Sequence, residues 1–302
     1  MTLQVFDRLV ARAQGLPRAP FAVVAPTTDV ALSGAISASL AGLIEPILVG
    51  DARAILAVGS RLGFDLSKVR IVDAPDDSDA ARQAVALCRE GAAMGLMKGS
   101  LHTDVLMHAV LDPQTGLRTA RRVSHVFVID APAYPRPLLV TDAAINIYPT
   151  LEDKVDIAKN AIELAHALGI PMPNLAILSA VETVSPKITS TIDAAALCKM
   201  ADRRQIIGAV LDGPLAFDTA VSAEAAAIKQ LISPVAGVAD VLLVPDLESG
   251  NMLAKQLEYL GGAELAGVVL GARVPIVLTS RSDSARARLA SCAVAVLRVA
   301  AG

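Results

Sequence analysis

Apolar runs rich in β-branched residues alternate with amphipathic stretches along nearly the whole chain of 302 residues. The run at 21–24, for example, is followed by an amphipathic stretch at 29–43. Strands separated by helices form βαβ units, in which the strands run parallel and helices cover both faces of the sheet. The alternation therefore predicts an α/β protein. The expected strands are 21–24, 45–51, 69–74, 95–100, 124–131, 136–144, 174–180, 206–213, 239–246, 267–271 and 275–279, and the expected helices are 29–43, 52–62, 78–90, 103–111, 150–168, 189–200, 220–231, 251–260 and 283–300.

One connection breaks this alternation. Only a short proline-rich turn separates the apolar runs at 124–131 and 136–144. Parallel strands need a longer crossover, so these two runs are expected to form an antiparallel hairpin. We place a domain boundary just before the hairpin, at 118–123, and expect the last strand and helix to return to the first domain. The expected α/β domains are 1–120 with 271–302, and 121–270.

The stretch at 150–168 has the clearest helix signals in the chain. Thr150 and Asp153 have the spacing of a capping box, with Asp in place of the usual Glu. Gly169 and Pro171 follow the apolar stripe of this stretch and are expected to end the helix.

Composition narrows the classes of function. Hydrophobic residues make up 54% of the chain, charged residues 19%, and the formal net charge is −3. Disorder needs low hydrophobicity and high net charge, and general nucleic-acid binding needs a basic surface, so neither is expected. No secretory signal or membrane span is visible, and the three cysteines, Cys88, Cys198 and Cys292, fit neither a disulfide framework nor a metal site. These features predict a reduced, cytoplasmic setting with no nucleic-acid or membrane partner.

Polar residues gather where the predicted strands end. In open α/β sheets, ligands bind at the carboxyl ends of the strands. One polar strand end is expected in any such protein, but a whole set of them, rich in Ser, Thr, Gly, Asn and Asp, indicates a large polar ligand in a cleft. The polar segments are 98–103, 141–146, 179–183, 211–218, 244–251 and 279–284.

The segment at 279–284 is the most cationic of this set. Arg281 offers a planar fork for phosphate oxygens, and Thr279 and Ser280 add hydroxyl donors. The following helix, expected to be capped by Ser282 or Asp283, adds free backbone N–H groups and a partial positive charge. An anion site fits this arrangement, but so does a helix cap beside a solvated arginine.

Other segments leave a similar choice open. Gly250 could bring the backbone close to a ligand to which Asn251 donates a hydrogen bond, or the segment at 244–251 could be only a strand, a turn and a helix start. His102 could serve as a general base or as a structural histidine. The basic cluster of Arg118, Arg121 and Arg122 could bind nucleotide phosphates or form a solvated turn.

Two nucleotide-binding motifs are missing from the sequence. There is neither a P-loop nor a G-x-G-x-x-G sequence after the first strand, so the sequence carries no motif for binding ATP or a dinucleotide. Residue patterns alone thus lead to an α/β enzyme with an anionic ligand.

Several longer segments occur in a characteristic order and spacing, among them "GLMKGSLHTDVLMHAVL", "TDAAINIYPTLEDKVDIAKNA" and "VLDGPLAFDTAV". The most specific are "PDL-x-x-GN" at 245–251 and "P-x-x-L-x-SR" at 275–281. Through these segments the chain resembles the phosphate acetyltransferase/phosphate butyryltransferase family over nearly its whole length.

This resemblance implies reversible transfer of a short acyl group between coenzyme A and inorganic phosphate, with acyl-CoA and phosphate as substrates and no metal or permanently bound cofactor. It also implies two α/β domains with an interdomain cleft, a fold related to isocitrate and isopropylmalate dehydrogenases, and a homodimer. Ser280 and Arg281 are then the catalytic pair, and His102 is a further catalytic candidate. The candidate substrate-binding residues are Ser100, Thr103, Asp246, Gly250, Asn251, Lys255 and Thr279.

Two positions depart from the acetyltransferase branch of the resembled family. That branch has an aspartate seven positions after the catalytic serine, proposed as the base for the CoA thiol, where this chain has Ala287. It also has an arginine in the helix after the "KGSLHT" region, where this chain has Leu106, Met107 and His108. Both departures resemble the butyryltransferase branch and the transferase half of chains fused to an enoyl-CoA hydratase domain. Acetyl, propanoyl and butanoyl groups therefore all stay open as the acyl group.

The missing aspartate leaves the base open among His102, Asp246, Asp283 and the substrate phosphate. It also leaves a rival function, a non-catalytic sensor that binds CoA or an acyl phosphate. A decarboxylating dehydrogenase of the related fold would need clustered aspartates for a divalent metal, and no such cluster is visible in the sequence.

Overall fold

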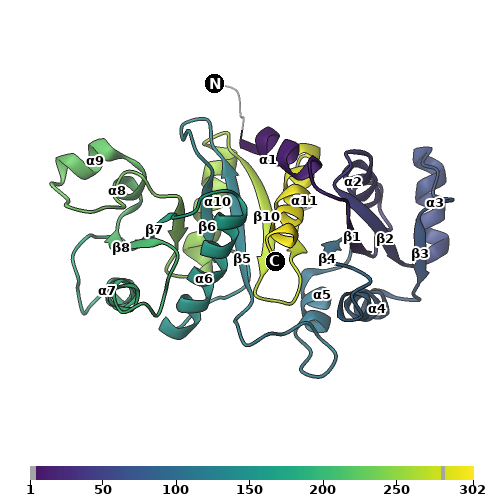
Figure 1. Cartoon of the computed structure of the whole chain (residues 1–302), viewed down its shortest axis with the longest axis horizontal. Coiled ribbons are helices and arrows are strands. Elements are labelled where there is room, and N and C mark those ends of the chain that lie inside the picture. Colours follow the sequence, from purple (N-terminus) through teal and green to yellow (C-terminus); the bar gives the residue numbers. More distant parts are fainter. Residues whose placement is uncertain (1–4, 280–282) are drawn as a thin grey trace. The chain divides into compact units, whose positions relative to one another are not determined.

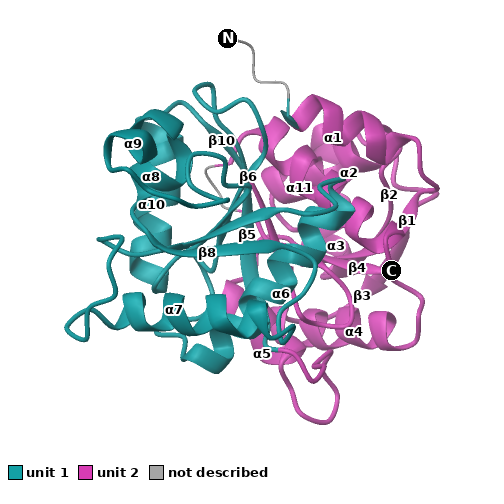
Figure 2. Cartoon of the chain, turned by 60° about the vertical axis from the view of Figure 1, so that its left-hand side comes forward, with its two compact units in different colours: residues 1–5, 122–265 teal, residues 6–121, 266–302 magenta. Residues whose placement is uncertain are grey.

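The computed structural model describes residues 5–279 and 283–302. The chain divides into two compact units, which Figure 2 draws in different colours. Unit 1 contains Val5 and residues 122–265, and unit 2 contains residues 6–121 and 266–302. The predicted catalytic pair, Ser280 and Arg281, lies outside the described residues.

Unit 2 is built on strands in the order β3-β2-β1-β4-β11-β10. Neighbouring strands are parallel except β10 and β11, which are antiparallel. β1 pairs on both sides and is almost completely buried, whereas β3 at the edge exposes Arg70 and Asp73. The elements, labelled in Figure 1, are α1 (Val5–Gln14), β1 (Ala19–Val24), α2 (Asp29–Leu40), β2 (Ile44–Gly50), α3 (Ala52–Leu62), β3 (Arg70–Asp73), α4 (Asp77–Arg89), β4 (Gly95–Lys98), α5 (Thr103–Val110), β10 (Glu264–Leu270), β11 (Ile276–Val277) and α11 (Ala285–Ala300).

Unit 1 has strands in the order β5-β6-β9-β7-β8. β5 and β6 form the expected antiparallel hairpin, with Val126 opposite Thr141, and the other neighbours are parallel. The elements are β5 (Ser124–Asp130), β6 (Leu138–Thr141), α6 (Leu151–Ala167), β7 (Asn174–Leu178), α7 (Thr189–Asp202), β8 (Val210–Leu215), α8 (Phe217–Val221), α9 (Ala223–Ile228), β9 (Val241–Leu243) and α10 (Leu247–Tyr259).

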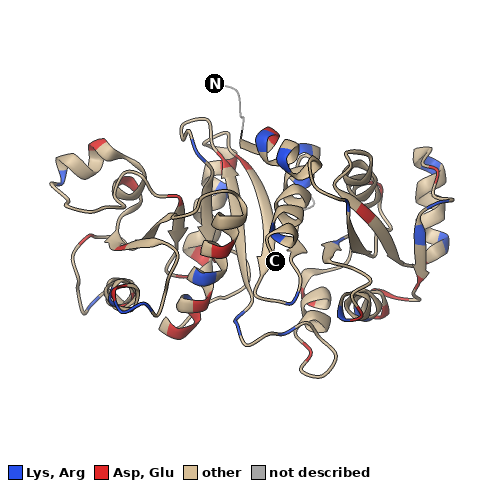
Figure 3. Ribbon diagram, in the orientation of Figure 1, with Lys and Arg blue, Asp and Glu red and all other residues tan. Residues whose placement is uncertain are grey.

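Local signals explain why these segments fold as they do. The capping box at the start of α6 is confirmed: Thr150 accepts a hydrogen bond from the backbone of Asp153, and the Asp153 carboxylate accepts one from the backbone of Thr150. Figure 3 shows that most charged residues lie on helices and loops, whereas the strands carry few. Strands that are covered on both faces need apolar side chains in both directions, which accounts for the continuous apolar runs in the sequence.

The predicted helix boundaries were wrong in several places. Helix α1 was not predicted, although Phe6, Leu9 and Ala13 form a buried stripe at helical spacing. The expected helix at 220–231 is two short helices, because Ser222 has an extended backbone and its side chain accepts a hydrogen bond from the backbone of the next helix, α9.

Two helix starts were also misplaced. Helix α10 begins at Leu247 rather than 251, since Asp246 is its N-cap. The N-cap of α11 is Ser284, not Ser282 or Asp283, and its hydroxyl accepts a hydrogen bond from the Ala287 backbone.

Among the described residues, no helix has both the length and the apolar character that crossing a membrane requires.

Candidate functional site

A pocket of about 260 Å³ lies in unit 2, where β1 and β4 end. In the register of these parallel strands, Val24 lies opposite Lys98, so both chains leave the sheet at the same edge. Carboxyl ends of parallel strands are where α/β proteins bind ligands. The described lining comes from the start of α2, the end of β4 with the turn after it, the end of the segment that follows β11, and the first turn of α11. It consists of Thr28, Val30, Ala31, Met97, Lys98, Gly99, Ser100, Thr279 and Arg288.

The turn after β4 packs tightly on the end of β1. The Gly99 backbone N–H donates to the Val24 carbonyl at 2.8 Å, and a Cβ at Gly99 would lie 2.3 Å from that oxygen. No residue other than glycine fits at this distance. The Ser100 hydroxyl donates to the Ala25 carbonyl at 2.5 Å and lies 2.8 Å from the Thr27 hydroxyl. The close approach therefore fixes Ser100 at the pocket wall.

Helix α2 directs its N-terminus at the pocket. Its N-cap is Thr28, whose hydroxyl accepts a hydrogen bond from the Ala31 backbone. The first turn of a helix has free N–H groups and a partial positive charge, which attracts anions. The acidic residue in this turn, Asp29, is paired with Arg61 of α3, so its charge is partly neutralised.

A buried arginine lies on the α11 side of the pocket. Only 9% of the Arg288 surface is exposed, and its Nη2 donates to the Asp283 carbonyl at 2.9 Å. Its aliphatic stem runs along α2 at Gly34, where a Cβ would lie 3.5 Å from Arg288 Cδ. A buried cation is costly unless an opposite charge or several hydrogen bonds stabilise it. The pocket wall thus combines two cations, Lys98 and Arg288, with three hydroxyls and a helix N-terminus.

The structure places the sequence candidates of unit 2 as follows. Ser100 and Thr279 line the pocket, whereas His102 and Thr103 are not part of its lining. His102 is exposed and is the N-cap residue of α5, although its side chain makes no capping hydrogen bond, and Thr103 is the first residue of that helix. Lys98 belonged to the polar segment noted in the sequence, but Thr28 and Arg288 were missed.

The sequence candidates in unit 1 are held by contacts inside that unit. Asp246 caps α10 by accepting from the Ser249 backbone and hydroxyl, both at 2.8 Å. The Asn251 amide donates to the Ala143 carbonyl at 3.3 Å. Lys255 pairs with Glu258 at 2.7 Å and lies 5.6 Å from the Tyr259 ring centroid.

Gly250 has a packing reason to be glycine. It is buried, and a Cβ there would lie 2.7 Å from Val244 Cγ2 and 3.1 Å from both Ala143 Cβ and the Asp142 carbonyl oxygen. In the structure the close approach is to the turn at 142–146 of the same unit, whereas the sequence was interpreted as allowing an approach to a ligand. A role for Gly250 toward a ligand stays a prediction.

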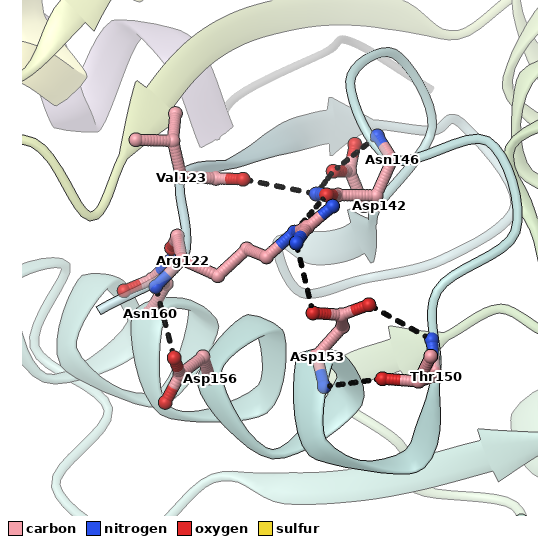
Figure 4. A network of polar contacts seen from close by, with 8 residues as sticks. All are labelled: Arg122, Val123, Asp142, Asn146, Thr150, Asp153, Asp156 and Asn160. Atoms are coloured by element: carbon pink, nitrogen blue, oxygen red, sulfur yellow. Dashed lines mark hydrogen bonds and ion pairs between the residues drawn. The ribbon is translucent and has the colours of Figure 1, made fainter. Parts of the chain in front are cut away.

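The turn at 142–146 lies at the centre of a polar network, which Figure 4 shows. The Asp142 carboxylate accepts from the backbone N–H groups of Ala144, Ile145 and Asn146, and from the Asn146 amide at 2.6 Å. The side-chain oxygen of Asn146, Oδ1, in turn accepts from Arg122 Nε at 2.7 Å.

Arg122 ties this turn to the helix α6. Its guanidinium pairs with Asp153 at 3.1 Å and its backbone N–H donates to Asp156 at 2.9 Å. Asn160, also on α6, donates to the Arg122 carbonyl. Of the basic cluster noted in the sequence, Arg122 thus takes part in the internal polar network of unit 1, while its side chain stays half-exposed.

The protein's own thiols and its buried histidine are poorly suited to chemistry. Burial raises the pKa of the Cys88 and Cys292 thiols to about 12 and that of Cys198 to about 11. Burial lowers the pKa of His125 to about 3, and its Nδ1 has no hydrogen-bond partner among the described residues. Raised pKa values make thiols weak nucleophiles at neutral pH, so these cysteines are not favoured in that role.

The fold is that of an α/β protein with a pocket at strand ends, lined by cations and hydroxyls, and comparison with known proteins identifies the family. Residues 76–296 match the family described as phosphate acetyl/butaryl transferase. The chain is 59% identical to a phosphate acetyltransferase of Rhizobium meliloti over 98% of this chain and 93% of that protein. It is 39% identical to a phosphate butyryltransferase of Clostridium acetobutylicum over 98% of each.

A solved structure agrees with these sequence relationships. A branched-chain phosphotransacylase from Enterococcus faecalis superimposes with a TM-score of 0.83 at 32% identity, over 93% of this chain and 99% of that one. The protein is an acyltransferase, and the chain belongs to the phosphate acetyl/butyryl transferase family.

Proposed function

We propose that the protein transfers a short acyl group reversibly between coenzyme A and inorganic phosphate, and that the pocket of unit 2 holds the phosphate. The observation that carries the proposal is the lining of that pocket, in which Lys98 and Arg288 lie with the Ser100 and Thr279 hydroxyls at a helix N-terminus. This is the chemistry that recognises a multiply charged oxyanion. Family membership supplies the reaction class.

The size of the pocket favours the small substrate. Sites for drug-sized ligands enclose about 300–1,000 Å³, whereas this pocket encloses about 260 Å³. An acyl phosphate is far smaller than coenzyme A. We therefore assign the pocket to the phosphate and the acyl group, and not to the nucleotide part of coenzyme A.

The reaction balances without another reactant. A phosphate oxygen attacks the thioester carbonyl carbon, the carbonyl oxygen takes the negative charge of the tetrahedral intermediate, and the C–S bond breaks to release CoA thiolate, which takes a proton. In the reverse direction the thiolate attacks the acyl phosphate and phosphate leaves. Preorganised donors that face the developing oxyanion are the main contribution a protein makes to such a step.

Roles for individual residues are part of the proposal. Arg281 would stabilise the phosphate and the developing charge, and Ser280 would donate to the carbonyl oxygen or contact the thiol. A free thiol has a pKa of about 8.5, so a base or a positive field helps to form the thiolate. His102 is exposed at the start of α5, outside the lining of the pocket, and stays a candidate base only as a proposal.

Asp246 is a weaker candidate for the base than the sequence suggested. Its carboxylate already accepts two hydrogen bonds from Ser249 as the cap of α10. Ala287, which stands in place of the acetyltransferase aspartate, is buried on α11 and donates its backbone N–H to Ser284. The comparisons lend no support to a non-catalytic sensor.

The proposal also covers the domain architecture, the oligomeric state and the cellular location of the protein. The two units would be the two α/β domains of an isocitrate dehydrogenase-like architecture, with boundaries at 121/122 and 265/266. The interdomain cleft, the homodimer and the cytoplasmic location stay predictions. Each unit has its own parallel strands and covering helices, which supports reading them as domains.

The test of the proposed function is a panel of acetyl-, propanoyl- and butanoyl-CoA with phosphate, following release of the CoA thiol. One wall of the pocket is apolar, formed by Val30, Ala31 and Met97. Each methylene buried there contributes about 0.8 kcal/mol, so we expect kcat/KM for butanoyl-CoA to equal or exceed that for acetyl-CoA.

The control for this panel is a variant that fills space along the apolar wall of the pocket. Ala31→Leu should reduce kcat/KM for butanoyl-CoA more than for acetyl-CoA, because the added side chain takes the room of the longer acyl group. Absence of turnover with every member of the panel would refute the proposed function, and a strong preference of the wild type for acetyl-CoA would refute the assignment of the apolar wall.

A further inference from the structure

We infer that Arg288 is a further substrate-binding residue, whose guanidinium holds the phosphate group in the pocket of unit 2. The inference rests on the proposed function, because it concerns the same pocket. The starting observation is a charged side chain that is 9% exposed and lines a cavity large enough for a small anion.

The position of Arg288 is fixed by its backbone and its stem. It lies in the first turn of α11, one turn after the N-cap Ser284. Its stem lies against Gly34 of α2, and Nη2 donates to the Asp283 carbonyl at 2.9 Å. A guanidinium has five N–H donors in a rigid fork, an arrangement that matches the oxygens of a phosphate.

The charges around the pocket favour a dianion over a neutral ligand. Within the described lining, Lys98 and Arg288 are the charged residues and both are cations, while no carboxylate lines the cavity. Ser100 and Thr279 add hydroxyls, and α2 adds its N-terminus. Two cations that line one partly enclosed space attract a doubly charged anion more strongly than a neutral ligand.

The chemistry of arginine determines which step it can affect. A guanidinium binds through its charge and its N–H donors and is unsuited to proton transfer, so we assign Arg288 to binding. The neighbouring residue is Ala287, in the place of the acetyltransferase aspartate, and its buried side chain offers no such group. We therefore expect Arg288 to set the affinity for phosphate rather than the pH dependence of the rate.

The experiment compares two arginines on the same helix. Arg288→Met keeps most of the stem that packs on Gly34 and removes the charge. The matched control is Arg286→Met, since Arg286 lies two residues earlier, pairs with Asp7 at 3.0 Å and faces the Phe6 ring. Affinity for inorganic phosphate is measured by calorimetry, alongside the KM values for phosphate and for acyl-CoA.

We expect Arg288→Met to weaken phosphate binding and to raise the KM for phosphate by at least about tenfold, as loss of a hydrogen bond to a charged group does. The KM for acyl-CoA and the pH–rate profile should stay close to those of the wild type, and Arg286→Met should change none of these quantities. A folded Arg288→Met protein that binds phosphate as the wild type does would overturn the inference.

A second variant keeps the inference testable if Arg288→Met does not fold. Arg288→Lys retains a cation but loses the planar fork, so phosphate should bind severalfold more weakly. Wild-type affinity for phosphate in this variant would overturn a role for the guanidinium fork. Phosphate binding is measured without turnover, so the two proposals can fail separately. An inactive wild type would refute the proposed function. The effect of the Arg288 substitutions on phosphate binding would still decide this inference.

Discussion

The polar strand ends of the two units look alike in sequence but differ in the structure. In unit 1, the turn at 142–146 and the start of α10 use their polar groups on one another, as Asp142, Asn146 and Asp246 show. In unit 2, the corresponding groups after β4 line an open pocket. Polar residues at a strand end are therefore a stronger indication of a ligand site where they line a cavity than where they bond only to one another.

The difference has a physical cause. The unit 1 turn is rich in carboxylate and amide groups, which accept hydrogen bonds from nearby backbone N–H groups and so close on themselves. The lining of the unit 2 pocket instead combines cations and hydroxyls beside a helix N-terminus, although Ser100 also donates to the Ala25 carbonyl. Cations and hydroxyls gathered at one cavity beside a helix N-terminus favour an anion as the ligand.

The largest expected effect concerns the proposed catalytic pair, Ser280 and Arg281, which lies outside the described residues. Arg281→Ala should lower turnover by ~100-fold or more, as removal of one preorganised charged donor does, while the protein stays folded. Steady-state kinetics on a protein whose thermal unfolding matches the wild type would check this. Near-normal turnover would remove Arg281 from the proposed mechanism and leave the cations of the described pocket to do its work.

The next prediction tests whether unit 1 uses its polar segment for structure. Gly250→Ala places a methyl group 2.7 Å from Val244 Cγ2 and should destabilise the protein by about 1–3 kcal/mol, the usual range for overpacking. Chemical or thermal denaturation measures the loss. The control is Gly34→Ala on α2 in unit 2, where the new Cβ makes only ordinary contacts at 3.5 Å and stability should be kept.

The result for Gly250 decides between two readings of this glycine. Lost stability with an unchanged KM for acyl-CoA in the remaining folded protein would support the packing role. Unchanged stability with a raised KM would instead show that Gly250 is glycine because a ligand approaches it.

The smallest expected effect concerns an ion-pair cluster at the ends of β7 and β8. Lys229 pairs with Glu182 at 2.9 Å and with Asp218 at 3.0 Å, and it holds the pKa of both carboxyl groups below their ordinary values. A lowered pKa in the folded state gives stability that is present above the ordinary carboxyl pKa and is lost as pH falls through the lowered value.

Lys229→Met should therefore cause a small loss of stability at neutral pH that disappears in acid. Denaturation curves at several pH values measure it, and Lys199→Met, which removes an exposed pair with Asp202, serves as the control with little effect. A loss for Lys229→Met that is the same at every pH would show that the variant acts through packing and not through the charges.

Much of the fold could be predicted because the local sequence signals agree with the way in which the strands pair and the helices connect them. The alternation of runs predicted parallel strands, the short connection before Leu138 predicted the hairpin, and the spacing of Thr150 and Asp153 predicted a cap. The break between helices α8 and α9 at Ser222 could not be predicted, since a serine within an apolar helical pattern can continue a helix or cap the next one.

The candidate site was harder to predict than the fold. The sequence indicated Ser100 and Thr279, because both stand at strand ends. It did not indicate Arg288, since helical periodicity places an arginine on a face of α11 but does not tell what packs against that face. At Gly250 the sequence indicated a close approach, and only the structure shows that the Asp142 carbonyl lies there.

The most direct test of the account is a crystal structure of the protein grown with inorganic phosphate and CoA. We expect phosphate in the pocket of unit 2, within hydrogen-bond distance of the Arg288 guanidinium and of the Ser100 or Thr279 hydroxyl. Phosphate bound only at the start of α10 in unit 1, with the pocket of unit 2 holding water, would contradict the account.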